Sequence, residues 1–282
     1  MENKKAGSEI RLDLTVTCPI GRNPDFEETS IMAAPVTRFA INGYKGRMGV
    51  AVAKVLDQAK HPVSAKYEKG DMFDLTRTDA VIDFSSPEAS LSLLEACAGE
   101  GLARPRPLVH VIGSTGFTPE QRDELIRFAD EVVIIQSGNF SLGVNLLMGL
   151  LKQAAARLAA EDWDIEIVEA HHRRKVDAPS GTALMLGEAA AYGRNVRLDE
   201  VKVAARDGIT AARRAGDIGF SVIRGGGIVG EHSAVLASED EILTLSHSAR
   251  DRTLFARGAI QAALWGRTQK AGFYDMQDVL GL

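Results

Sequence analysis

The stretch VTRFAINGYKGRMGVAVAKVLDQA, residues 36–59, decides the fold. Its beginning, VTRFAIN at 36–42, is typical of a short buried strand and runs directly into the glycine-rich GYKGRMG at 43–49. Apolar residues at helical spacing follow over 47–59. A strand, a glycine turn and a helix in this order are typical of a dinucleotide-binding fold. The strict G-x-G-x-x-G spacing is not met because Lys45 fills the middle position, so a plain tight turn is the alternative.

The same alternation of strand-like and helical runs continues through the first half of the sequence. Helices are predicted over 87–101 and 118–131, and Thr118 followed by Pro119 is typical of a helix start. Strands are predicted within residues 61–71, 79–90, 107–117 and 132–141. Strands and helices at this spacing indicate a parallel sheet that helices cover on both faces.

The second half has a different pattern. A long amphipathic helix is predicted at 142–159, a strand at 164–172, a helix near 181–192, strands at 218–225, 227–237 and 240–249, and a helix at 253–266. The last strand alternates apolar and polar residues, as a half-buried antiparallel strand does. We therefore predict an α/β protein: a Rossmann-like parallel-sheet domain, then a second α+β domain with a mixed or antiparallel sheet.

These patterns divide the chain into three parts. Residues 1–34 lack a clear helical or strand period, and we expect them to be a flexible extension. The dinucleotide-binding domain is predicted at 35–141 and is completed by 252–282, because the final helix and tail are expected to pack on it. The second domain is predicted at 142–251.

Composition limits the classes of partner. The net charge of −5 argues against nucleic acid as the main partner. The longest apolar runs are too short to span a membrane, so we expect no membrane partner. The two cysteines, Cys18 and Cys97, lie far apart and form no motif, which is typical of unpaired thiols in the cytoplasm.

An acidic residue lies where a dinucleotide site needs one. Glu68 follows the second predicted strand, about twenty residues beyond the glycines, where such an acid binds the adenosine ribose. Lys69 follows it, and a cation favours the 2′-phosphate of NADP. The pair predicts use of NADH or NADPH, and a solvated charged loop is the alternative.

Two further loops of small residues follow predicted strands. They are Gly113–Ser114–Thr115–Gly116 and Ser137–Gly138–Asn139–Phe140. Ligands of open α/β sheets bind at the carboxyl ends of the strands, so we interpret both loops as walls of a nicotinamide site. Small-residue turns are the alternative.

The segment EAHHRRKVDAPSGTAL, residues 169–184, contains several side chains that are able to transfer protons. His171 and His172 are adjacent, and Lys175 follows. Neighbouring residues of a strand point to opposite faces, so the pair is not expected to bind one metal ion, and we predict no metal site. Imidazole and ammonium groups together are typical of proton transfer near neutral pH. The alternative is that the two histidines are ordinary surface residues.

A helix start follows these groups directly. Pro179 fixes the entry, Ser180 is a good N-cap, and Gly181 leaves backbone N–H groups uncovered. Such a helix end binds a carboxylate or phosphate without further side chains. The segment therefore predicts a site for a small acidic substrate beside proton donors.

This segment closely resembles the signature of the 4-hydroxy-tetrahydrodipicolinate (dihydrodipicolinate) reductase family. The motifs GYKGRMG, IDFSSPEAS, VIGSTGF, GNFSLGVN, IVGEH and DMQDVLGL also resemble that family, in the same order. The resemblance covers roughly residues 36–282. Its most specific part is the H-H-x-x-K-x-D-A-P-S-G-T block.

The resemblance implies NAD(P)H-dependent reduction of a cyclic dicarboxylate to tetrahydrodipicolinate, a step of diaminopimelate and lysine biosynthesis. It implies that His171 is the proton donor or acceptor, that Lys175 is a second proton donor, and that the second domain assembles a homotetramer. The substrate-contacting residues are His172, Gly181 and Thr182, to which the capping argument adds Ser180. The implied nucleotide contacts are Gly43, Tyr44, Lys45, Gly46, Arg47, Met48, Glu68, Lys69, Gly113, Ser114, Thr115, Ser137, Gly138, Asn139 and Phe140.

Two other functions stay open at this point. One is a different two-domain NAD(P)-dependent reductase, such as an aspartate dehydrogenase or a semialdehyde dehydrogenase. The latter needs an active-site cysteine, and Cys97 falls in a predicted helix outside the loops. The other is a nucleotide sensor without catalysis, against which the intact histidine–lysine block argues.

Overall fold

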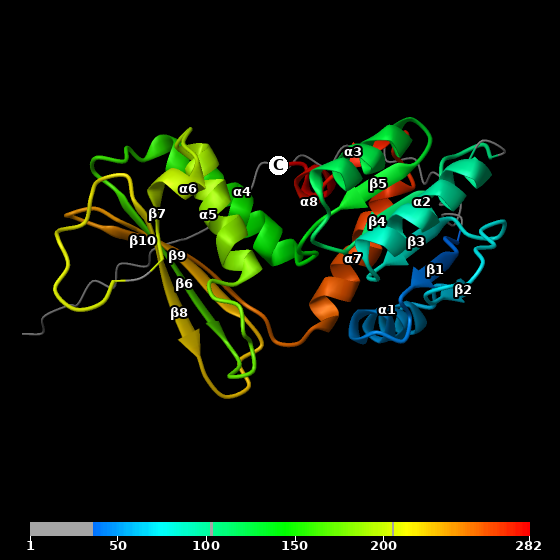
Figure 1. Cartoon of the computed structure of the whole chain (residues 1–282), viewed down its shortest axis with the longest axis horizontal. Coiled ribbons are helices and arrows are strands. Elements are labelled where there is room, and N and C mark those ends of the chain that lie inside the picture. The colour runs from blue at the N-terminus through cyan, green and yellow to red at the C-terminus, as the bar shows by residue number, and fades with distance from the viewer. Residues whose placement is uncertain (1–35, 102–103, 205) are drawn as a thin grey trace, which may run out of the picture. The chain divides into compact units, whose positions relative to one another are not determined.

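A computed structural model describes residues 36–282, apart from 102, 103 and 205. The predicted extension at 1–34 and Cys18 lie outside the described residues. The described chain contains two sheets with helices packed on them (Figure 1). None of its helices has both the length and the apolar content needed to cross a membrane.

Sheet A has six strands in the order β11-β5-β4-β3-β1-β2, and every neighbouring pair is parallel. Its strands are β1 (Phe39–Asn42), β2 (Val63–Tyr67), β3 (Ala80–Asp83), β4 (Val109–Ile112), β5 (Val133–Gln136) and β11 (Gly272–Tyr274). Its helices are α1 (Arg47–Gln58), α2 (Pro87–Gly101), α3 (Pro119–Arg127), α7 (Thr253–Gly266) and α8 (Met276–Leu280), with a 3₁₀ turn, η1, at Phe128–Asp130. This is the predicted Rossmann-like sheet.

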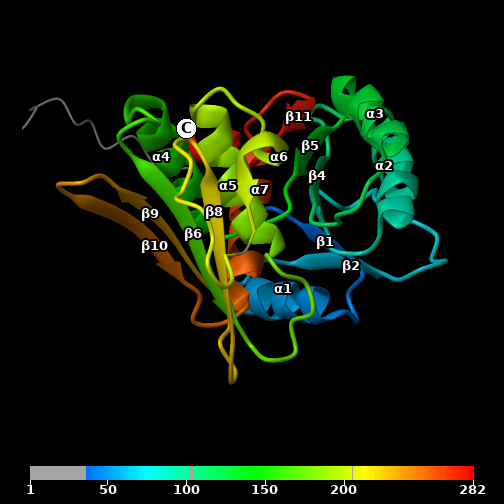
Figure 2. The same ribbon diagram turned by 60° about the vertical axis from the view of Figure 1, so that its left-hand side comes forward.

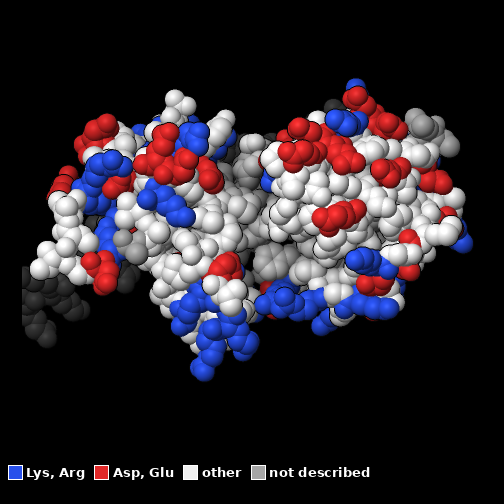
Figure 3. Space-filling view, viewed as in Figure 1, with Lys and Arg blue, Asp and Glu red and all other residues white. Residues whose placement is uncertain are grey.

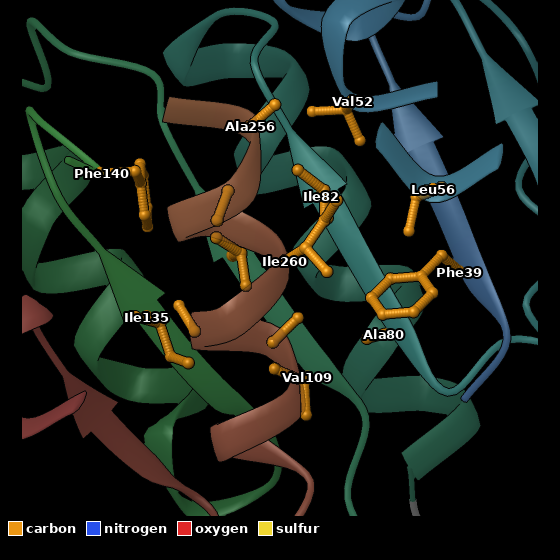
Figure 4. Packing of buried hydrophobic residues seen from close by; sticks show 14 of the residues in the cluster. Phe39, Val52, Leu56, Ala80, Ile82, Val109, Ile135, Phe140, Ala256 and Ile260 are labelled. Atoms are coloured by element: carbon orange, nitrogen blue, oxygen red, sulfur yellow. The ribbon is translucent and has the colours of Figure 1, made fainter. Parts of the chain in front are cut away.

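Helices bury both faces of the central strands of sheet A, which explains why β1, β3, β4 and β5 are mostly apolar. On one face, Phe39, Ile82 and Ile135 pack with Val52 of α1 and Ile260 of α7 (Figure 4). On the other face, alternate strand residues such as Ala40, Val81, Ile112 and Ile134 pack with α2 and α3. Neighbouring residues of one strand therefore point into different cores, one on each face of the sheet.

The strand order reverses beside β1, since β2 lies on one side of it and β3 on the other. The loops after β1 and β3 therefore form the crevice where open α/β sheets bind ligands. Gly43 has a φ of +72°, and a Cβ on Gly49 would lie 2.2 Å from the Gly43 carbonyl oxygen. These glycines thus allow the loop and α1 to approach each other more closely than an ordinary tight turn requires.

Sheet B has five strands in the order β10-β9-β6-β8-β7. Its strands are β6 (Asp164–His171), β7 (Lys202–Val203), β8 (Ile218–Arg224), β9 (Glu231–Ala237) and β10 (Ile242–Ser248). The pairs β6–β8 and β7–β8 are parallel, whereas β6–β9 and β9–β10 are antiparallel. The prediction of a mixed second sheet is confirmed.

One face of sheet B is buried and the other is bare. Helices α4 (Leu142–Arg157) and α5 (Gly181–Gly193) pack on one face, and the described residues place no helix on the other (Figure 2). Apolar side chains are exposed at Ile223 and Ile242, by 52% and 69%. Exposed apolar side chains on a sheet face that no helix covers are typical of a protein interface.

Four short elements were not predicted from the sequence: α6 (Leu198–Val201), β7, β11 and α8. The strand predicted at 227–237 was also too long, because it begins only at Glu231. Segments of two to five residues are too short to show a helical or strand period. The division into domains at 141 and 252 stays a prediction.

Candidate active site

Twelve of the predicted cofactor and substrate residues line one cleft with a volume of about 730 Å³. Its predicted members are Arg47, Met48, Gly113, Thr115, Ser137, Gly138, Asn139, Phe140, His171, His172, Lys175 and Thr182. The loops at the carboxyl ends of β4 and β5 thus meet the end of β6 and the start of α5. Segments distant in sequence contribute to a single cavity.

A neighbouring cavity of about 720 Å³ lies over the strand-order reversal. It is lined by Gly43, Gly46, Glu68 and Lys69, together with residues after β3. The Lys45 N–H donates to the Glu68 carboxylate at 2.6 Å, so Glu68 is fixed against the glycine loop. An acid fixed beside the loop suits the ribose end of a dinucleotide.

Three predicted nucleotide contacts, Tyr44, Lys45 and Ser114, line neither of these cavities. Tyr44 packs on the core beneath α1, and Ser114 is buried and shares a hydrogen bond of 3.0 Å with the Ser90 hydroxyl. Ser114 lines a third cavity together with Thr115, Ser137 and Gly138.

His171 is the last residue of β6, and a buried carboxylate holds its ring. Its Nδ1 lies 2.5 Å from Oε2 of Glu169, which is 1% exposed. The Arg224 guanidinium donates to both oxygens of Glu169, at 2.7 and 2.8 Å. Burial alone would raise the pKa of Glu169, but hydrogen bonds from Arg224, His171 and the Ser180 N–H outweigh it and lower the pKa.

A second buried histidine adjoins this group. The His232 ring lies edge-on to the His171 ring, with centroids 5.1 Å apart, and its Nε2 lies 3.2 Å from the Ser180 hydroxyl. Burial, reinforced by the charge of His171, lowers the pKa of His232 to about 4. His232 is therefore neutral at neutral pH.

His172 corrects one step of the sequence argument. Strand alternation predicted that His171 and His172 point to opposite faces, yet both line the cleft. The reason is that β6 ends at His171, so His172 no longer follows the alternation. Burial, and next the positive charge of Arg174, lowers the pKa of His172.

The cleft is positively charged. Lys175 is 22% exposed, and its Nζ lies 2.8 Å from the Asp177 carboxylate. Three arginines also line the cleft, Arg47, Arg174 and Arg252. Figure 3 shows basic side chains gathered along the lower part of this face, whereas most acidic ones lie above. Such a cavity favours an anionic ligand, although the chain as a whole is acidic.

The start of α5 matches the prediction only in part. Ser180 is the N-cap, and its hydroxyl accepts from the Ala183 N–H, which confirms the predicted cap. Ser180 is however buried and does not line the cleft, and neither does the exposed Gly181. Thr182 lines it, and its Oγ1 accepts from Asn139 Nδ2 at 2.9 Å. The Ser180 hydroxyl thus takes the Ala183 N–H, whereas the N–H groups of Gly181 and Thr182 have no acceptor within the helix and remain suited to an anion.

Several residues of the site were missed from the sequence. Nothing in the sequence besides their charge indicated that Arg174 and Arg252 belong to the site, because only the fold brings them to the cleft. Glu169 did give one, since it lies two positions before His171 and residues two apart share one face of a strand. Arg224 and His232 lie on β8 and β9, whose pairing with β6 no sequence pattern fixed.

The described residues contain no group of three histidine, cysteine or acidic side chains that is able to hold a metal ion. Cys97 is fully buried in α2, away from the cleft, and burial raises its thiol pKa. A buried thiol of raised pKa is a poor nucleophile. Within residues 36–282, therefore, no cysteine suits semialdehyde dehydrogenase chemistry.

Comparison with known proteins gives a consistent result. The family model described as "Dihydrodipicolinate reductase, N-terminus" matches residues 37–140, and "Dihydrodipicolinate reductase, C-terminus" matches 143–280. A 4-hydroxy-tetrahydrodipicolinate reductase from Caulobacter vibrioides is 56% identical over 260 residues, covering 89% of this chain and 99% of the relative. One from Sinorhizobium medicae is 50% identical over 237 residues, covering 84% and 79%.

A solved structure shows the same fold. It is a dipicolinate-bound dihydrodipicolinate reductase from Paenisporosarcina sp. TG-14, with a TM-score of 0.68 and 22% identity. The similarity covers 86% of this chain and 98% of that one.

Proposed function

The chain belongs to the dihydrodipicolinate reductase family, and we propose that its cleft reduces 4-hydroxy-tetrahydrodipicolinate to tetrahydrodipicolinate. It is an NAD(P)H-dependent oxidoreductase of diaminopimelate and lysine biosynthesis. One observation supports the assignment of the cleft most strongly: the nicotinamide loops, His171, Lys175 and Thr182 line one cavity.

The glycine loop fits a dinucleotide. A Cβ on Gly49 would overlap the loop backbone, so the close approach of α1 that exposes its first N–H groups depends on glycine there. Gly43, Gly46 and Glu68 would hold the adenosine and pyrophosphate part, and Thr115 with the 137–140 loop would hold the nicotinamide. When bound, the reduced nicotinamide supplies the hydride.

The basic side chains and the start of α5 suit the two carboxylates of the substrate. Thr182 and the first N–H groups of α5 bind one carboxylate, and Arg174 and Arg252 attract the other. His171 and Lys175 lie in the same cavity and exchange protons with the substrate. Glu169 and Asp177 balance their charges.

We propose that both nucleotides are used. Glu68 suits the free ribose diol of NADH, and Lys69 adjoins it in the same cavity as a partner for the phosphate of NADPH. Lysine is a point charge without the bidentate fork of arginine, so its preference for the phosphate is weak. Steady-state kinetics with each nucleotide test this, and E68A is expected to lower kcat/KM for NADH more than for NADPH.

The test of the function is a coupled assay. A dihydrodipicolinate synthase supplies its product, and loss of reduced-nicotinamide absorbance is followed with intact protein. The proposal predicts turnover and inhibition by pyridine-2,6-dicarboxylate, a planar dicarboxylate. Protein that binds NADH but neither turns over nor responds to that compound would contradict the proposal and favour a sensor.

A homotetramer and a cytoplasmic location also remain proposals. The bare face of sheet B supports the first, because its exposed apolar side chains need cover. The biosynthetic role of the family supports the second.

A further inference from the structure

Glu169 connects the two halves of the proposed substrate site. Its Oε2 accepts from His171 Nδ1 at 2.5 Å, and its Oε1 accepts from the Ser180 N–H at 2.9 Å, at the N-cap of α5. Arg224 donates to both oxygens and, through Nη2, to the Asp177 carbonyl at 2.7 Å. All of the acceptor capacity of this buried carboxylate is used.

We propose that Glu169, held by Arg224, is a positioning residue: it orients the His171 ring so that Nε2 faces the substrate, and it fixes the start of α5 relative to that ring. This inference rests on the proposed function. A carboxylate only accepts hydrogen bonds, so its contact requires a proton on Nδ1 of His171. Proton exchange with the substrate is therefore left to Nε2.

The surroundings of His171 agree with this orientation. A Cβ on Gly230 would lie 3.1 Å from His171 Nε2, so the absence of a side chain there keeps this nitrogen accessible. The His232 ring packs edge-on against His171 and fixes the plane of the ring from another strand. Glu169 on one side and His232 on the other leave His171 little rotational freedom.

Glu169 also places a negative charge directly beside the His171 ring. The low pKa of Glu169 keeps its carboxylate ionised near neutral pH. The charged or titratable groups around this pair are Glu169, Arg224, Asp177, His172, Arg174, Lys175, Arg252, His232 and His247. Among these, Glu169 is the acidic group in direct contact with the imidazole.

The test replaces Glu169 by glutamine. In E169Q the amide oxygen still accepts from the Ser180 N–H, but the amide NH₂ faces Nδ1 of His171 and the negative charge is lost. We expect kcat to fall at least ten-fold, with nucleotide KM changed less than two-fold. The pH profile of kcat/KM should also differ from that of the wild type, because the negative charge in contact with Nδ1 of His171 is lost.

The matched control is E166Q on the same strand. Glu166 is also held by arginines, Arg206 and Arg213, but it does not line the cleft. Its variant should retain wild-type kcat and pH profile. In an H171A background, E169Q should cause little further loss, because a positioning residue acts through the ring that is now absent.

The outcomes separate the two levels of inference. Active wild type and E166Q, with E169Q unchanged in kcat and pH profile, would overturn the positioning role alone. An equal loss from E169Q with and without His171 would overturn it as well. Inactive wild-type protein would refute the proposed function, and the positioning role with it. If E169Q does not fold, E169D is the second variant, because it keeps the charge but shortens the side chain by one methylene. We expect E169D to have a lower kcat and an unchanged pH profile of kcat/KM.

Discussion

The two histidines His171 and His232 lie in contact, yet their different surroundings suit them to different roles. His171 has a carboxylate at Nδ1 and a cavity in front of it. His232 has a hydroxyl partner, and its other ring nitrogen is buried without a hydrogen-bond partner among the described residues. A paired, accessible imidazole suits proton exchange, whereas a buried, unpaired one is kept neutral and serves as packing.

Lys175 gives the clearest prediction for a single residue. K175A should lower kcat by about 10²–10⁴-fold, the usual contribution of a positioned proton donor. Nucleotide binding should change less than about two-fold, since we propose that Lys175 acts on the substrate and not on the nucleotide. The exposed carboxylate of Asp177 makes the lost ion pair worth at most about 1 kcal/mol of stability.

Single-turnover kinetics and NADH titration of K175A measure both effects. K152A is a suitable control, because Lys152 lies over the Tyr192 ring and outside the cleft. Equal losses in kcat and in nucleotide affinity would mean that Lys175 contacts the cofactor instead.

His232 makes folding stability depend on pH. Its pKa is about 4 in the folded chain against 6.5 ordinarily, so the unfolded chain binds the proton more readily. Stability from this group is complete above pH 6.5 and is lost as the pH falls toward 4. The full difference is about 3 kcal/mol.

Urea unfolding at pH 7 and at pH 4.5 measures this effect, with H232Q as the comparison. The wild type should lose about 2 kcal/mol more than H232Q between the two pH values. Other buried acids, such as Asp83, whose pKa is also lowered, weaken both proteins alike and cancel. An identical decline in both proteins would contradict the assignment.

At the scale of elements, the sequence predicted those long enough to show a period. The strand within 36–42 and the helix at 47–59 correspond to β1 and α1, and 142–159 corresponds to α4. Three-residue β11 has no period of its own and exists because it pairs with β5. Tertiary contacts determine such elements, and a single sequence does not show those contacts.

Gly49 provides a test of the turn between β1 and α1. In G49A the added Cβ would meet backbone atoms of Gly43 and Tyr44, which cannot move aside as a side chain can. We expect a loss of about 1–3 kcal/mol in stability and at least ten-fold weaker nucleotide binding. Thermal unfolding and NADH titration measure the two effects.

The control for G49A is another helical glycine. A Cβ on Gly99 in α2 would meet nothing within 4 Å, so G99A should be neutral or stabilise by up to about 1 kcal/mol. Normal nucleotide binding by G49A would indicate that the glycine turn is not the phosphate site.

At the scale of the whole molecule, the bare face of sheet B predicts association. Light scattering should report a tetramer, and lysine at both Ile223 of β8 and Ile242 of β10 should reduce it to smaller species. Both side chains are exposed on the single chain, so the substitutions cost the fold little. I126K, at a similarly exposed isoleucine of α3, a helix that packs on sheet A, should remain tetrameric.

The site was only partly predictable for the same reason as the fold. The glycine loop and the segment from His171 to Thr182 are each continuous in the sequence, so the sequence alone indicates their roles. The arginines of the cleft and the partners of His171 come from separate elements. Ser180 lies inside the motif and is a buried cap in the structure, and its contact with the substrate stays a prediction.

The close packing of α7 on sheet A has a consequence for protein synthesis. Gly258 of α7 lies so near Phe140 that a Cβ would fall 1.7 Å from its carbonyl oxygen, and Ile260 belongs to the core of the sheet. Both α7 and β11 follow sheet B along the chain. On the ribosome, every strand of sheet B therefore emerges before sheet A receives its covering helix and edge strand. A nascent chain would expose the part of sheet A that α7 covers throughout that interval, when chaperones that bind apolar surfaces have access to it.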